Sequence, residues 1–363
     1  MTTAPRFSFE YIKRTLQFKF EAGTSRGVLK TRNVYWIKVF SPHNPTVVGW
    51  GEAAPLVKLS IDDRPDFEAI LSATLKESSR IQWNSDQREL LFQIQKQLSP
   101  ELPSIRFGIE TALLDLFQGG KKKIFDNDFY DHQAPIPING LIWMGNKEFM
   151  IDQIEEKLAQ GFACIKMKIG AIDFEQELGL LKAIRARYSK NEIVLRVDAN
   201  GAFEPRDAIE KLNNLAELDI HSIEQPIAAG QVATMKSLCR NTPLPIALDE
   251  ELIGVRDKAS LLDAILPQHI ILKPSLVGGI AETEEWIKLA EERNIGWWMT
   301  SALESNIGLN AIAQLASKFD PAIPQGLGTG KLYHNNLQSP LEVESGKIKY
   351  NPSLAWETPV WNL

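Results

Sequence analysis

The sequence is poor in residues that mark several protein classes, with 2 cysteines and 5 histidines among 363 residues. Both cysteines, Cys164 and Cys239, lie in apolar or helical patterns, so the chain is predicted to be intracellular and without disulfide bonds. No apolar run approaches the about 18 residues of a membrane span. Charged residues also interrupt the first twenty positions, which disfavours a signal peptide. We therefore expect a cytoplasmic protein.

Clusters of positive charge are also lacking. The chain has 40 Lys and Arg against 46 Asp and Glu, a net charge of −6, and no basic tail. Neither nucleic acid nor a membrane surface is therefore an expected partner. No Gly-x-Gly-x-x-Gly opens a helix after a strand, which disfavours a dinucleotide-binding domain.

The overall composition is typical of a globular protein with a large core, since 44% of the residues are hydrophobic and 24% are charged. The length suits a barrel of about 250 residues and an accessory domain of about 100. Two domains are the expectation.

The first 130 residues are predicted to form an α+β capping domain, because strand patterns precede helical ones. The expected strands are residues 7–20, 33–40 and 47–53, and the expected helices are residues 66–76, 85–98 and 104–117, the last with Ser104 as its N-cap. The polar, glycine-containing stretch 21–32 is expected to be a connector or a mobile lid.

From about residue 134, short apolar runs alternate with amphipathic helices. Eight runs are expected, at residues 136–143, 164–169, 193–198, 221–225, 245–249, 269–273, 296–302 and around 327. The seven helices between them are expected at residues 148–160, 174–188, 205–218, 232–240, 255–266, 280–294 and 307–319. This alternation predicts an α/β fold in which residues 131–330 form a (β/α)7β TIM-like barrel. Residues from about 331 to 363 are expected to return to the capping domain.

One ionisable residue stands at the end of each of five consecutive runs. These residues are Lys168, Asp198, Glu224, Asp249 and Lys273, at intervals of 24 to 30 residues. Such an interval corresponds to one βα unit. In a barrel the five side chains would converge on the C-terminal mouth, where active sites of this fold lie.

Lys166 and Lys168 share one face of their predicted strand, opposite Met167. A lone Lys-x-Lys is also typical of a solvated sheet face. Two buried ammonium groups side by side would instead disfavour the charged form, which is how a lysine becomes a base near neutral pH.

Three carboxylates at one mouth require a counter-ion. Asp198 and Asp249 alone could serve a turn and a helix N-terminus, but Glu224 ends a buried run. Oxygen ligands select a hard divalent cation, and a site shared with substrate and water suits Mg²⁺. His221 and His269 begin their runs and would lie at the opposite mouth, so zinc is not expected.

Lysines beside a carboxylate-bound Mg²⁺ indicate removal of a proton α to a substrate carboxylate, because the metal and an ammonium stabilise the enediolate that forms. The expected partner is thus a small-molecule carboxylate. A Schiff-base aldolase also uses a barrel lysine, but it would leave the three carboxylates unexplained.

These motifs resemble the enolase superfamily, in the branch with Lys-x-Lys on the second strand and a lysine on the sixth. Within it, the chain most resembles the o-succinylbenzoate synthase family. The resemblance covers nearly the whole chain and is carried by residues 49–55, 106–110, 112–115, 272–275, 278–279, 300–305 and 326–330.

The resemblance implies a role for each candidate site residue. Asp198, Glu224 and Asp249 would bind Mg²⁺. Lys168 would remove the α proton and then, as its conjugate acid, help the hydroxyl leave, with Lys273 on the opposite side of the ring. The remaining implied contacts are Lys166 with a carboxylate oxygen, Asn200 at the metal mouth, and Ser301 and Gly328 with the succinyl tail.

The implied reaction is dehydration of 2-succinyl-6-hydroxy-2,4-cyclohexadiene-1-carboxylate in menaquinone biosynthesis. Racemases and epimerases of the superfamily would use Lys168 and Lys273 as two opposed bases, and N-succinylamino-acid racemases keep nearly the same site. Dipeptide epimerases are expected to carry an acidic motif after the eighth strand, and residues 326–333 contain no acid. A barrel that binds a carboxylate without turnover is disfavoured, because it would not need all five ionisable groups.

Overall fold

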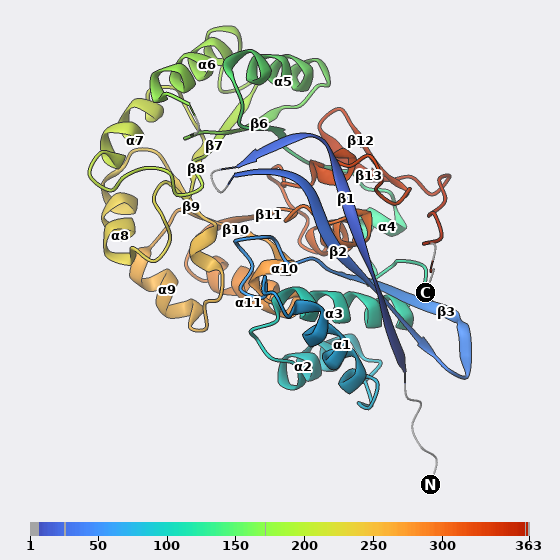
Figure 1. Ribbon diagram of the computed structural model, residues 1–363. Coiled ribbons are helices and arrows are strands. Elements are labelled where there is room, and N and C mark those ends of the chain that lie inside the picture. The colour runs from blue at the N-terminus through green and yellow to red at the C-terminus, as the bar shows by residue number, and fades with distance from the viewer. Residues whose placement is uncertain (1–6, 25–26, 171, 360, 362–363) are drawn as a thin grey trace.

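The computed structural model describes residues 7–24, 27–170, 172–359 and 361. Its first layer is an antiparallel sheet in the order β1-β2-β3, formed by β1 (Ser8–Thr24), β2 (Gly27–Ser41) and β3 (Asn44–Ala53). The long β1–β2 hairpin runs from the helices that follow it to the edge of a second sheet (Figure 1).

The stretch 21–32 is not a simple connector, because both strands continue into it and pair there up to Thr24 and Gly27. The sequence pattern missed this extension, since Gly23 and Gly27 are poor strand formers and Val28 is exposed although it is apolar. Ser25 and Arg26, which belong to the expected lid, lie outside the described residues.

Helices α1 (Phe67–Ser78) and α3 (Pro103–Phe117) pack on the first sheet, and α2 (Gln87–Gln97) packs on α3. Helix α3 packs closely on β3, where a Cβ on Gly51 would lie 1.9 Å from the carbonyl oxygen of Gly108, so only glycine fits. The predicted N-cap of α3 is wrong: Leu102 occupies that position, and the Ser104 hydroxyl donates to buried Asp62 at 2.6 Å.

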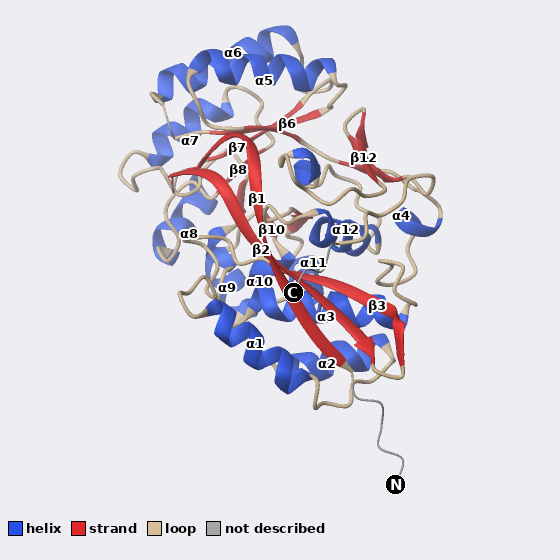
Figure 2. Cartoon of the chain, turned by 45° about the vertical axis from the view of Figure 1, so that its right-hand side comes forward, coloured by secondary structure: helices blue, strands red, loops and turns tan. Residues whose placement is uncertain are grey.

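The second sheet has seven parallel strands in sequential order from β5 to β11. They are β5 (Gly140–Ile142), β6 (Cys164–Lys168), β7 (Val194–Asp198), β8 (Ser222–Glu224), β9 (Ile246–Leu248), β10 (His269–Leu272) and β11 (Gly296–Met299). The α/β alternation is therefore confirmed, and strands and helices alternate along this half of the chain (Figure 2).

Helices connect these strands, and α5 to α9 form an arc outside them in Figure 1. They are α5 (Lys147–Ala159), α6 (Phe174–Arg187), α7 (Ala208–Ala216), α8 (Val232–Asn241), α9 (Lys258–Ile265), α10 (Pro274–Val277), α11 (Ile280–Glu291) and α12 (Asn306–Ser317), with the 3-10 turn η1 (Glu250–Leu252). A short helix, α4 (Asp128–Asp131), precedes the sheet.

Two expected strands differ from the prediction. The first run is split, because β4 (Ile136–Pro137) pairs with β13 while β5 begins only at Gly140. The eighth run forms no named strand among the described residues. Its residues make isolated parallel bridges instead, Gly326 with Thr300 after β11 and Gln325 with Ile138 before β5.

The last residues connect both parts of the chain. The 3-10 turn η2 (Gly328–Lys331) is followed by a segment in which Tyr333 forms a bridge with Phe18 of β1. Strands β12 (Leu341–Glu344) and β13 (Lys347–Tyr350) then form a small sheet with β4.

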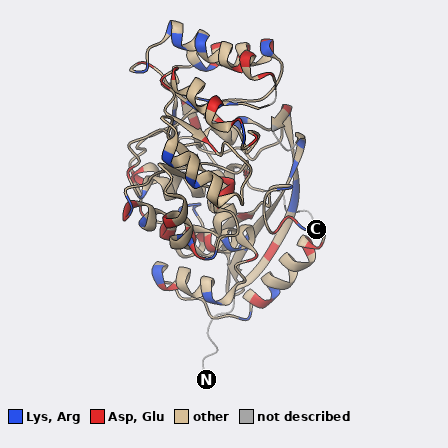
Figure 3. Ribbon diagram, turned by 90° about the vertical axis from the view of Figure 1, so that its left-hand side faces the viewer, with Lys and Arg blue, Asp and Glu red and all other residues tan. Residues whose placement is uncertain are grey.

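Positively and negatively charged residues are interspersed along the helices (Figure 3). No helix in the described part of the chain is long and apolar enough to cross a membrane.

Candidate active site

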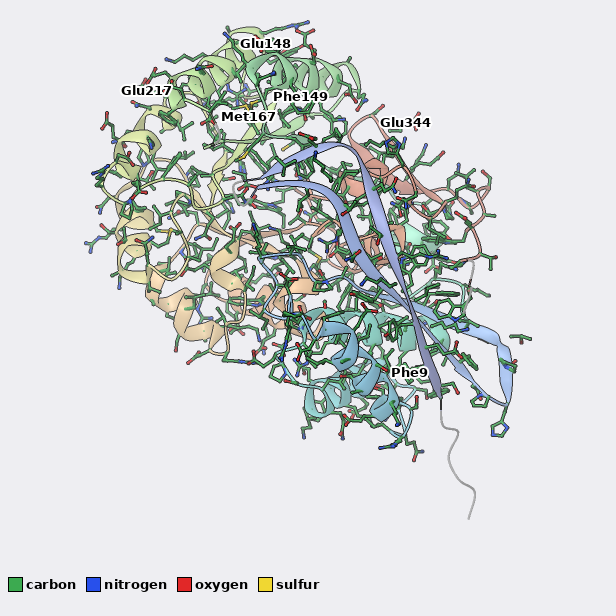
Figure 4. All side chains as sticks on the ribbon, viewed as in Figure 1. Phe9, Glu148, Phe149, Met167, Glu217 and Glu344 are labelled. Carbon is green, nitrogen blue, oxygen red and sulfur yellow. The ribbon has the colours of Figure 1, made fainter. Side chains whose placement is uncertain are left out.

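The lysine pair lies on β6 between two neighbouring strands of the parallel sheet. Lys166 and Lys168 are each 8% exposed, so the solvated-face interpretation is wrong. Met167, labelled in Figure 4, is fully buried on the opposite face of the strand. Lys168 lies opposite Asp198 of β7, and Asp198 lies opposite Glu224 of β8. The strand register alone therefore brings these side chains together.

The two lysines pair with these carboxylates. Lys166 lies 2.9 Å from Asp198 Oδ2 and also donates to Glu224 Oε2. Lys168 donates to the same Asp198 oxygen at 2.9 Å and to Asn200 Oδ1 at 2.7 Å. Asn200 in turn donates to Glu250 at 3.1 Å, which fixes the amide orientation that Lys168 requires.

Asp198 serves both a turn and the cluster. Its Oδ1 accepts from the backbone N–H of Asn200 at 3.0 Å, an Asx-turn that lets Asn200 adopt a φ of 44°. Its Oδ2 faces the two lysines. The turn signature and the functional position are thus properties of the same residue.

Lys273 joins the cluster from the end of β10. Its ammonium donates to Asp249 and lies 3.9 Å from Glu224 Oε1. Asp249 precedes η1 but makes no side-chain cap bond, so its carboxylate is left for the cluster. The side-chain carbonyl of Gln225 accepts from the backbone N–H of Asp249 at 3.2 Å and of Glu251 at 3.3 Å, and so holds this turn in place.

The charges in the cluster perturb one another strongly. Burial lowers the pKa of Lys166, but the carboxylates of Asp198 and Glu224 outweigh it and raise that pKa above its ordinary value. Burial also lowers the pKa of Lys273, but the carboxylate of Asp249 outweighs burial, so this pKa too is raised above its ordinary value. The pKa of Asp198 is lowered, because the lysines outweigh its burial. The pKa of Glu224 is raised well above its ordinary value, by burial and by the charge of Asp198.

The donor set fits a hard divalent cation. Asp198, Glu224 and Asp249 are almost completely buried at the ends of three neighbouring strands, and Glu224 Oε1 accepts no hydrogen bond from a described residue. Mg²⁺ prefers hard oxygen ligands, and carboxylates supply them. In the described part of the chain no three acidic, histidine or cysteine side chains converge as a ready metal site. The lysine ammonium groups lie between the carboxylates instead.

A cavity of about 1160 Å³ opens above this cluster. Of the nine predicted site residues, eight line it: Lys166, Lys168, Asp198, Asn200, Glu224, Lys273, Ser301 and Gly328. Asp249 lies behind the wall against Lys273 and is not among the lining residues that the structure describes. The hairpin contributes Phe20 and Val28 to the opposite wall.

The hydroxyl of Ser301 is fully engaged within the protein. It donates to Glu304 Oε2 at 2.6 Å and accepts from the backbone N–H of Leu303 at 3.0 Å and from Thr329 Oγ1 at 2.9 Å. A hydroxyl has one donor and two acceptor sites, so no capacity remains for a ligand. Glu304 also accepts from Ser275.

Sequence reasoning missed Gln225 and Glu304. Gln225 directly follows Glu224, and Glu304 lies within the 300–305 motif, so both stood next to recognised residues. Gln225, however, accepts from the turn after β9, and Glu304 accepts from Ser275 after β10, contacts that no local pattern indicates.

At the opposite end of the sheet, His221 and His269 stack with ring centroids 5.3 Å apart. Their neighbour there is Trp298, over whose ring Arg196 lies at 4.1 Å. These histidines are therefore remote from the carboxylate cluster, as their positions at the start of the runs predicted.

Comparison with known proteins identifies the class. The family model described as "Enolase C-terminal domain-like" matches residues 150–353. The chain belongs to this family, the enolase superfamily, and the resemblance found in the sequence is confirmed.

Similar individual proteins include the o-succinylbenzoate synthase of Desulfotalea psychrophila, 46% identical over 93% of this chain and 97% of that protein. The crystal structure of MenC from Desulfotalea psychrophila LSv54 matches with a TM-score of 0.84 at 41% identity, over 95% of this chain and 99% of that one. A dipeptide epimerase from Enterococcus faecalis, solved with Mg and the dipeptide L-Leu-L-Tyr, has a TM-score of 0.78 at 19% identity, covering 95% and 97% of the two chains.

Proposed function

We propose that the chain is an o-succinylbenzoate synthase, which dehydrates 2-succinyl-6-hydroxy-2,4-cyclohexadiene-1-carboxylate to o-succinylbenzoate in menaquinone biosynthesis. The main support for this proposal is that Lys166, Lys168 and Lys273 converge with three buried carboxylates below one cavity. Identity of 46% with the Desulfotalea psychrophila synthase over 93% of the chain supports the particular reaction.

We infer that the enzyme is Mg²⁺-dependent. Asp198, Glu224 and Asp249 would hold the ion, which would neutralise the substrate carboxylate and the negative charge that develops on it. Glu224 Oε1, which accepts no hydrogen bond from a described residue, and the all-carboxylate donor set support this assignment. The Mg-bound epimerase of the same fold is consistent with it.

We propose that Lys168 performs both proton transfers. Its Nζ takes the proton from the carbon α to the ring carboxylate, and the C–H electron pair moves into the carboxylate to give an enediolate. The resulting ammonium then gives that proton to the hydroxyl leaving from the same face. The C–O bond breaks, water departs and the ring becomes aromatic. Asn200, which accepts from Lys168 at 2.7 Å, would orient the amine.

The other two lysines would act as charges. The pKa of Lys273 is raised, mainly by Asp249 against its burial, so it would remain a cation beside the developing enediolate. Lys166, whose pKa is also raised, by Asp198 and Glu224 against its burial, would hold a carboxylate oxygen. Ser301 would shape the tail pocket without a hydroxyl bond to substrate, and Gly328 would leave room for the tail.

We propose that the seven strands and residues 325–327 form a closed (β/α)7β barrel, since bridges to Thr300 and to Ile138 lie on either side of the eighth run. Residues 131–330 would be the barrel domain. Residues 1–130 would be the capping domain, to which residues from about 331 return, as the Phe18–Tyr333 bridge suggests.

One observation also favours a second candidate, an N-succinylamino-acid racemase or related epimerase. Lys168 and Lys273 approach the carboxylate cluster from strands on opposite sides of β8, as two bases acting on opposite faces of a substrate would.

The experiment is to incubate the purified protein and Mg²⁺ with the cyclohexadiene carboxylate and follow the aromatic product by absorbance and mass. We expect stoichiometric o-succinylbenzoate and a slower reaction when the α hydrogen is replaced by deuterium. Failure to form the aromatic product would contradict the proposal.

A further inference from the structure

The cavity is lined by two kinds of lysine. Lys166, Lys168 and Lys273 at its base are paired with carboxylates. Lys19 and Lys331 at its rim are exposed, and neither side chain has an ion pair or hydrogen bond to any described residue. The rim therefore presents positive charge that no described acidic residue neutralises.

Main-chain hydrogen bonds hold these two rim lysines close together although they are remote in sequence. The backbone N–H of Lys19 donates to the carbonyl of Leu332 at 2.9 Å, and the adjacent Phe18 forms a bridge with Tyr333. The Tyr333 hydroxyl donates to the carbonyl of Leu303 at 2.7 Å, which fixes this segment to the cavity wall. Lys19 and Lys331 are therefore held near each other by the hydrogen bonds between their two chain segments.

Strand alternation directs Lys19 away from the core. Phe18 is 7% exposed and belongs to a buried aromatic cluster with Trp143 and Tyr333. Lys19 occupies the opposite face of β1, as neighbouring strand residues do, and lines the cavity.

A continuous wall leads from the base of the cavity to this rim. It runs from Ser301 through Gly328 and Thr329 to Lys331. Residues of a 3-10 helix rise about 2 Å each, so η2 spans about 6 Å from Gly328 to Lys331, about the length of a four-carbon acyl tail. A ligand held at the base by one carboxylate would thus place an anionic tail end near the rim.

The hydroxyl groups of this wall are not available to bind the anionic tail end. The Ser301 hydroxyl has its donor and both acceptor sites occupied, and the Thr329 hydroxyl donates to Ser301. A carboxylate there needs donors, and the unpaired ammonium groups of the rim supply them.

We propose that Lys19 and Lys331 form an anion subsite that binds the distal carboxylate of a dicarboxylate substrate, an inference that rests on the proposed function and identifies its tail-recognition residues. The subsite selects substrates by tail charge and leaves the proton transfer at Lys168 unchanged.

The test compares two substrates in Lys19→Met, Lys331→Met and the double variant: the natural dianion, and an analogue whose terminal carboxylate is a carboxamide. A hydrogen bond to a charged group corresponds to roughly a tenfold to hundredfold change. We expect each single variant to lower kcat/KM for the dianion about tenfold, mostly through KM, with less than a threefold change for the carboxamide. Added salt should lower the dianion's kcat/KM more in the wild type than in the double variant.

Lys58→Met is the matched control, because Lys58 is also an exposed cavity-lining lysine without an ion pair to a described residue, but on a separate segment. We expect less than a threefold change there. An equal loss in Lys58→Met, or equal losses for dianion and carboxamide in the rim variants, would overturn the subsite. If the wild type turns over the dianion and the carboxamide equally well, the subsite is also refuted while the proposed function stands. A wild type that dehydrates neither refutes the proposed function itself.

Discussion

Replacing Lys168 with methionine separates chemistry from folding most clearly. Lys168→Met removes the proposed base and acid, and each such role contributes about 10²- to 10⁴-fold to rate. Because one amine serves both steps, we expect kcat/KM for dehydration to fall by at least about 10⁴.

The cost to stability should be small. Asp198 keeps Lys166 at 2.9 Å and the backbone N–H of Asn200 at 3.0 Å, so its charge remains compensated. The lost bonds, to Asp198 and to Asn200 Oδ1, predict a decrease of about 1–3 kcal/mol in the free energy of unfolding. Lys166→Met should cost more: Asp198 would keep Lys168, but Glu224 Oε2 would lose its ammonium partner, and breaking a buried pair costs about 3–5 kcal/mol.

The assay is kcat/KM at saturating Mg²⁺, together with urea unfolding at constant m-value. Lys182→Met, on the exposed face of α6, is the control and should match the wild type in both. Lys168→Met activity above about 1% of wild type would refute the assignment of the base.

Three further results are expected. Burial raises the pKa of Glu52 to about 7, so the folded state keeps a proton that the unfolded state releases above about pH 4.5, and the free energy of unfolding should fall as pH rises from about 4.5 to 7. In Glu52→Gln this dependence on pH should be flatter by up to about 1.4 kcal/mol per pH unit, and an unchanged slope would contradict the raised pKa. Glu304→Gln places an amide N–H against the hydroxyl of Ser301 or Ser275, so the free energy of unfolding in urea should fall by about 1–3 kcal/mol and KM should rise more than kcat falls. A variant as stable as the wild type would show that these hydrogen bonds do not stabilise the fold. A chelator should abolish turnover and added Mg²⁺ should restore it, whereas full activity in the chelator would exclude the metal. The circular dichroism spectrum should stay unchanged throughout, because the lysines still pair with the carboxylates.

The alternating half of the chain was predictable because its strands are buried and its helices are amphipathic. Strand β6, predicted at residues 164–169, spans Cys164–Lys168, and helix α6, predicted at residues 174–188, spans Phe174–Arg187. Local hydrophobicity determines both elements, so one sequence suffices to locate them.

Elements that depend on distant partners were mispredicted. The hairpin beyond Phe20 contains Gly23, Gly27 and an exposed Val28, so no local strand pattern indicates its pairing. The start of the first expected run forms β4, which pairs with β13. The Ser104 hydroxyl serves Asp62 rather than its own helix. In each case a contact made far along the chain overrides local preference.

The candidate site shows the same division. The regular spacing of strand ends predicted which lysines and carboxylates meet, because parallel strands in register align their ends. It could not predict that Ser301 has no free hydroxyl capacity, since Thr329 approaches it from another segment and Glu304 of the same segment takes its proton.

The most direct test of the central claim is a comparison of two activities in one wild-type preparation with Mg²⁺. It measures kcat/KM for dehydration of the cyclohexadiene carboxylate and for racemisation of N-succinylamino acids. We predict the larger value for dehydration; a larger value for racemisation would contradict the proposed function and favour the two-base alternative.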